Sequence, residues 1–89
     1  MHLLVVEDSE SIRFLLDLVF YPHQVTFAEN GAKALEALRG GTVPDLIVSD
    51  LDMPVMNGWE LRRRIEADPR VRDVPFIVFS SSERPPSAL

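Results

Sequence analysis

Hydrophobic and polar residues follow one another along the chain in blocks that predict alternating strands and helices. Four short, nearly continuous apolar runs cover residues 2–6, 25–28, 45–50 and 74–80, and such runs are typical of strands buried on both faces. Between them, apolar residues recur every three or four positions. This spacing predicts amphipathic helices over residues 10–20, between Asn30 and Gly40, and over residues 58–67.

Residues that start or stop helices support these bounds. Ser9 can cap the first helix, and Pro22 ends it. The apolar face of this helix is expected to consist of Ile12, Leu15, Leu16 and Val19. Gly40 and Gly41 terminate the second helix, and the third must finish before Pro69.

The order of these elements predicts the fold class. Three connections of helix length between four strands require a parallel sheet with helices on both faces. We therefore expect an α/β fold with a doubly wound parallel sheet. The domain should span residues 1–82, with a flexible tail over residues 83–89.

Composition narrows the possible partners. The 89 residues include 14 acidic and 9 basic side chains, a net charge of −5, which argues against a nucleic-acid surface and favours cations. Cysteine is absent, which excludes disulfides and thiolate metal sites and fits a reducing compartment. No signal peptide or membrane-spanning stretch of ~20 apolar residues is visible. We expect a soluble, cytoplasmic protein with no membrane partner.

Polar side chains follow three of the predicted strands at the point where each strand ends. Glu7 and Asp8 follow the first, Asp50 ends the third and Ser80 ends the fourth. In an open parallel sheet these ends share one edge, and ligands bind beyond them. A single such residue is most often a turn former or a helix cap, but several at one edge predict a site.

Crowded carboxylates repel one another, so their pKa values should rise unless a cation arrives. Mg²⁺ suits such a site, because it prefers oxygen ligands and typically uses one or two carboxylates together with a phosphate oxygen. A carboxylate beside this metal can attack phosphorus, and Asp50 is the candidate nucleophile. Ser80 could donate a hydrogen bond to the phosphoryl group once it is attached.

Four segments resemble the receiver domain of bacterial two-component response regulators: "LLVVEDSESIR", "AENGAKAL", "PDLIVSDLDMPVMNGWEL" and "VPFIVFSSS". The resemblance covers residues 2–82 and implies a flavodoxin-like receiver fold. It also implies that Asp50 accepts a phosphoryl group from a phosphohistidine on a sensor histidine kinase or phosphotransfer protein. Glu7 and Asp8 would hold Mg²⁺ together with Asp50 and the main-chain carbonyl of Asp52. Ser80 would be the switch hydroxyl.

The chain departs from the receiver pattern after the fourth strand. Receivers normally continue through a helix, a strand that carries a lysine, and a last helix, whereas this sequence stops at Leu89 and has no lysine after Lys33. We therefore expect a receiver fold truncated by this helix-strand-helix. Its fourth strand would be an open hydrophobic edge, which predicts a homodimer formed by edge pairing or by exchange of elements.

Two other functions stay open at this point. A haloacid-dehalogenase-type phosphatase would use Asp50 as nucleophile and Asp52 as general acid, because "IVSDLDMP" contains Asp-x-Asp after an apolar strand. A non-catalytic, receiver-like interaction module would account for the missing lysine. The resemblance favours a phosphoacceptor that is not a turnover enzyme, limited to its own phosphorylation and dephosphorylation.

Overall fold

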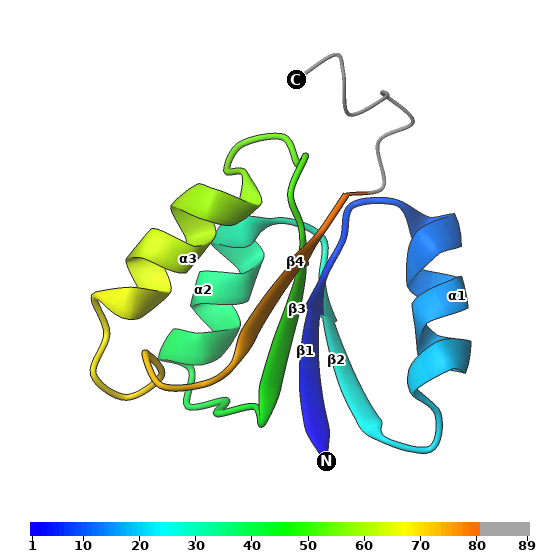
Figure 1. The fold of residues 1–89 in the computed structure, drawn as a ribbon, viewed down its shortest axis with the longest axis horizontal. Helices are drawn as coiled ribbons and strands as arrows, with labels where there is room; N and C mark the ends of the chain where they lie inside the picture. The colour runs from blue at the N-terminus through cyan, green and yellow to red at the C-terminus, as the bar shows by residue number, and fades with distance from the viewer. Residues whose placement is uncertain (81–89) are drawn as a thin grey trace.

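A computed structural model describes residues 1–80, which form four strands and three helices in strict alternation (Figure 1). The strands are β1 (His2–Val6), β2 (Gln24–Ala28), β3 (Leu46–Asp50) and β4 (Phe76–Phe79). The helices are α1 (Glu10–Phe20), α2 (Gly31–Arg39) and α3 (Gly58–Glu66). The predicted order is confirmed. The predicted tail, residues 83–89, lies outside the described residues.

The ends of the elements differ from the prediction by one or two residues. The fourth strand begins at Phe76 because the N–H of Val74 donates to the carbonyl of Val71 and so closes a turn. The third helix ends at Glu66, and Ala67 is its C-cap. Each helix begins after a polar cap whose side chain accepts an N–H of the first turn; these caps are Ser9, Asn30 and Asn57.

All four strands are parallel and lie in the order β2-β1-β3-β4. The apolar run of β1 therefore lies between two other strands, where Leu3, Leu4, Val5 and Val6 are fully buried. β2 and β4 are the edges of this sheet within residues 1–80. The sheet confirms the flavodoxin-like, doubly wound α/β fold.

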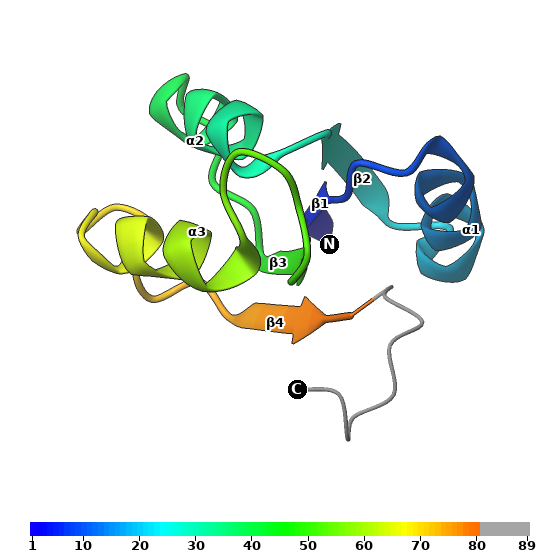
Figure 2. The ribbon, with the colours of Figure 1, turned by 90° about the horizontal axis from the view of Figure 1, so that it is seen from above.

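The helices cover the two faces unequally. Helices α2 and α3 lie side by side on one face, and α1 lies on the other (Figures 1 and 2). The larger core, between the sheet and the α2–α3 pair, is built from Leu4, Val6, Ala28, Ala34, Leu35, Leu38, Ile47, Met53, Leu61, Ile65 and Val71. Among residues 1–80, the core under α1 has three buried members, Leu3, Val5 and Val48.

Helix α1 packs differently from the prediction. Leu16 and Phe20 contact the sheet, but no residue of α1 is buried. Leu15 and Val19, expected on the buried face, are 55% and 69% exposed. The 3.6-residue period identified the helix correctly, but a wide apolar arc does not show which part of it meets the sheet.

No helix within residues 1–80 is both long enough and apolar enough to cross a lipid bilayer.

Candidate metal centre

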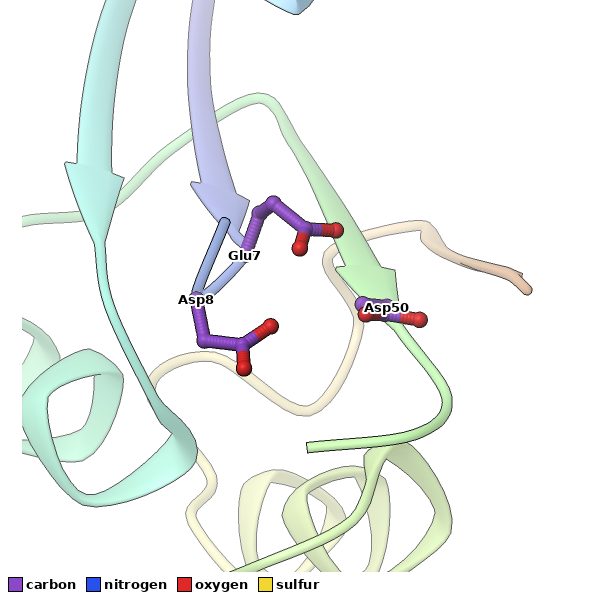
Figure 3. A group of neighbouring side chains, drawn as sticks. All are labelled: Glu7, Asp8 and Asp50. Atoms are coloured by element: carbon purple, nitrogen blue, oxygen red, sulfur yellow. The ribbon is translucent and has the colours of Figure 1, made fainter. Parts of the chain in front are cut away.

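Three carboxylates meet at the edge of the sheet where the strands end. Glu7 and Asp8 follow β1, and Asp50 is the last residue of the neighbouring strand β3. One oxygen from each side chain lies within 4.8 Å of the other two (Figure 3). Glu7 and Asp50 are fully buried, and Asp8 is exposed. The cluster is therefore anchored in the core and opens to solvent through Asp8.

The two oxygens of the Glu7 carboxyl group have different surroundings. Its Oε1 accepts the main-chain N–H of Ser9 at 3.0 Å. Its Oε2 is buried and has no hydrogen-bond partner among residues 1–80. Burial raises the pKa of Glu7 to about 7, with a further contribution from the negative charge of Asp50, while the Ser9 hydrogen bond acts in the opposite direction.

The Glu7 carboxyl group has no positively charged partner among the described residues. Buried carboxylates are normally paired or bound to a metal, because an isolated charge in the core is costly. A divalent cation between the three side chains would supply the missing charge and engage the unpartnered oxygen of Glu7. The donors are all oxygens, which is the ligand type that Mg²⁺ and similar hard cations prefer. The residues present thus fit such an ion.

The loop after β3 is organised around Asp50. Asp50 Oδ1 accepts the main-chain N–H of Asp52 at 3.2 Å. The Asp52 side chain in turn accepts the hydroxyl of Ser80, with an Oγ–Oδ2 distance of 3.3 Å. Ser80 follows β4 directly, so the structure brings the hydroxyl to the edge that carries the carboxylates. The roles of Ser80 and of the Asp52 carbonyl stay predictions.

The same loop turns tightly back into α3, and Gly58 makes this possible. A side-chain carbon at position 58 would lie 2.8 Å from the main-chain oxygen of Asp50 and 3.1 Å from Leu51 Cα. The N–H of Gly58 also donates to the carbonyl of Leu51 at 2.9 Å. Only glycine allows this close approach. The first residue of α3 therefore lies against the main chain of Asp50, the candidate phosphoacceptor.

Arg13 contributes to the site and was missed by the sequence reasoning. Its Nη1 donates to the main-chain carbonyl of Glu7 at 2.9 Å and so ties the first turn of α1 to the acidic loop. Arg13 is not among the residues predicted for the apolar face of this helix, so its spacing alone gave it no role. Its position one turn after the cap Ser9 was the available signal, because a side chain there points back along the helix toward its N-terminal end.

The sequence matches the family described as "Response regulator receiver domain" over residues 3–89. The chain belongs to this family. Its curated relatives include "Two-component response regulator ORR6" of Oryza sativa subsp. japonica, 34% identical over 89 residues. That match covers 96% of this chain but only 52% of the rice protein, so the chain spans about half the length of this relative.

Solved receiver structures share the fold of this chain. The N-terminal domain of a response regulator receiver protein from Methanoculleus marisnigri JR1 is 33% identical with a TM-score of 0.83, and the match covers 97% of this chain and 71% of that one. The Mn²⁺-bound form of the response regulator Rcp1 is 26% identical with a TM-score of 0.81, covering 93% and 67%. That neighbour, Rcp1, was thus solved with a bound divalent cation.

Proposed function

We propose that this receiver is a phosphoacceptor that takes a phosphoryl group onto Asp50 in the presence of Mg²⁺. The observation that carries the proposal is the meeting of Glu7, Asp8 and Asp50 at one edge of the sheet, with a buried Glu7 oxygen that has no hydrogen-bond partner within residues 1–80. Family membership supports it, because receivers act in two-component signalling. The partner would be a sensor histidine kinase or a phosphotransfer protein, and the cysteine-free composition fits a cytoplasmic location.

Glu7, Asp8 and Asp50 would hold the cation with their carboxylates, and Asp52 would contribute its main-chain carbonyl. Bound there, Mg²⁺ would offset the repulsion among the acids and stabilise the negative charge of the phosphoryl oxygens. The exposure of Asp8 leaves one side of the cluster open to solvent, so a phosphate oxygen and waters can complete the coordination shell.

In the transfer step, a carboxylate oxygen of Asp50 attacks the phosphorus of a phosphohistidine. A new O–P bond forms while the P–N bond breaks, and the imidazole nitrogen keeps the electron pair and takes up a proton. The hydrogen bond from Asp52 N–H to Asp50 Oδ1 orients the carboxylate for this attack. In the product, a phosphoryl group with a charge of about −1.5 to −2 replaces the single negative charge of the Asp50 carboxylate.

Ser80 would respond to that charge. Its hydroxyl donates to Asp52 in the unphosphorylated protein, and we propose that it turns to donate to a phosphoryl oxygen once Asp50 is modified.

The direct test is the intact mass of the protein after incubation with Mg²⁺ and acetyl phosphate. We expect the mass to rise by one phosphoryl group per chain, and chelation of Mg²⁺ to prevent the gain. Asp50→Asn should show no gain. Asp52→Asn is the matched control, because it makes the same Asp-to-Asn change two residues away and keeps the main-chain carbonyl. This variant should still be modified.

Other outcomes separate the alternatives. A wild-type mass that stays equal to that of Asp50→Asn would refute the phosphoacceptor proposal and favour a non-catalytic interaction module. Repeated hydrolysis of a phosphoester substrate, lost in both Asp50→Asn and Asp52→Asn, would instead indicate a phosphatase. We expect no such turnover from a receiver.

A further inference from the structure

Two basic side chains border a hollow beside the acidic cluster. The hollow has a volume of about 380 Å³ and is lined by Arg13, Phe27, Ala28, Glu29 and Lys33. Ala28 is the last residue of β2, so the hollow lies where that strand ends. β2 and β4 are opposite edges of the sheet, which places the hollow on the far side from β4. Arg13 and Lys33 are here called the basic pair.

Arg13 joins this hollow to the acidic cluster. Its Nη1 donates to the main-chain carbonyl of Glu7 at 2.9 Å, and the Glu7 carboxyl group is one of the three that meet at the sheet edge. A carbonyl oxygen carries no net charge. The hydrogen bond therefore fixes the guanidinium next to the cluster and leaves its positive charge in place.

Lys33 lies in the first turn of α2, which is an unfavourable place for a cation. The N-terminal end of a helix carries a partial positive charge and favours acidic residues, but α2 has none in its first turn. The ion pair of Lys33 with Glu36 spans 3.6 Å between side chains that are 55% and 66% exposed, so it contributes little to stability. Residues that break a local rule in this way are expected at functional sites.

The first turn of α2 also lies next to the loop that follows Asp50. A side-chain carbon at Gly31, the first residue of α2, would lie 2.8 Å from Met56 Sδ in that loop. Helices α1 and α2 both begin at the edge where the strands end (Figure 1). Helical side chains lean toward the N-terminal end of their helix, so both members of the basic pair lean toward this edge.

We propose, on the basis of the phosphoacceptor function above, that the basic pair draws the phosphoryl anion of the donor toward Asp50. The chain has a net charge of −5, and three carboxylates at the site repel an approaching phosphate. Positive charges at the entrance offset this repulsion and raise the rate of encounter. Glu29 lines the same hollow and weakens the attraction, but the two basic side chains outnumber it. The pair acts on the approach of the donor and not on the bond-breaking step.

The test is the rate of phosphorylation by acetyl phosphate at saturating Mg²⁺, followed by intact mass. At an ionic strength of about 50 mM and subsaturating acetyl phosphate, we expect Lys33→Gln to lower the second-order rate constant about twofold and Lys33→Glu about fourfold. These values follow from Coulomb's law for a doubly charged anion about 10 Å away in water. At about 0.5 M the screening length falls to about 4 Å, and the rates should converge.

Arg72→Gln and Arg72→Glu are the matched controls, because they make the same changes of charge. Arg72 is exposed and precedes β4, at the opposite edge of the sheet, where the strands begin. Both variants should keep the wild-type rate at each salt concentration. At saturating acetyl phosphate the rate should be the same in every variant. Lys33→Glu adds a negative charge near the cluster and should strengthen Mg²⁺ binding, so loss of the metal does not account for a slower reaction.

The outcomes separate this inference from the phosphoacceptor function. Equal rate constants for Lys33→Glu and Arg72→Glu at low salt would overturn the inference and leave phosphorylation of Asp50 intact. A deficit of Lys33→Glu that persists at 0.5 M would also overturn it, because an electrostatic effect must be screened. A wild type that gains no phosphoryl group would refute the phosphoacceptor function itself and this inference with it. Circular dichroism verifies that each variant folds.

Discussion

The buried Glu7 carboxyl should make the metal-free protein lose stability as the pH rises, and Glu7→Gln should remove that loss. The pKa of Glu7 rises from 4.5 to about 7, chiefly because of burial. Between these values the folded state holds a proton that the unfolded state has released. The unfolded state therefore binds fewer protons, and the free energy of unfolding falls as the pH increases through this window.

The size of the effect follows from the pKa change. A rise from 4.5 to about 7 corresponds to roughly 3 kcal/mol of lost stability above pH 7, at about 1.4 kcal/mol for each tenfold change in proton affinity. Glutamine is neutral at every pH and keeps an oxygen to accept the N–H of Ser9. Its amide N–H groups must be accommodated in the buried site, which reduces the gain. We expect Glu7→Gln to be about 1–3 kcal/mol more stable than wild type at pH 8 and nearly equal to it at pH 4.5.

Urea denaturation followed by circular dichroism, in EDTA at several pH values between 4.5 and 8, measures this difference. Glu29→Gln is the control, since Glu29 is an exposed carboxylate just beyond the end of β2, and its profile should run parallel to wild type. Adding Mg²⁺ at pH 8 should stabilise wild type and Glu29→Gln more than Glu7→Gln, because the cation needs the ionised carboxylate. Wild-type and Glu7→Gln profiles that run parallel across this range would refute the reasoning.

Three further predictions concern the loop after β3 and the core. Val55 has a φ of 72° and is 82% exposed. A β-branched residue is strained in this left-handed region, whereas asparagine tolerates it. Val55→Asn should therefore raise the free energy of unfolding, measured in urea, by about 1 kcal/mol. Gly58→Ala should destabilise the protein and weaken Mg²⁺ binding, because the alanine methyl group would collide with the main chain of Asp50. Calorimetric titration measures the Mg²⁺ affinity, and an unchanged affinity would contradict the prediction. Leu61 is fully buried in the larger core, and Leu61→Ala should lower the melting temperature through a loss of about 2–5 kcal/mol.

The sequence by itself determined the order of the elements. Apolar runs and helical spacing along the chain reflect local burial, and the cap Ser9 acts within a single turn, so these features can be predicted without knowing the fold. The meeting of strand-end acids could also be predicted, because a parallel sheet brings the ends of its strands to one edge whatever their separation in sequence.

The tertiary structure alone decided how these parts fit together. It placed β1 between β2 and β3. This position buries Glu7 and leaves one of its oxygens without a hydrogen-bond partner in the described part of the chain. It turned Leu15 and Val19 of α1 into solvent, although their spacing matches that of buried residues. Burial and pairing depend on which elements become neighbours, and that is set by packing between distant segments. A periodic pattern records how apolar a face is, but only the packed molecule determines what covers it.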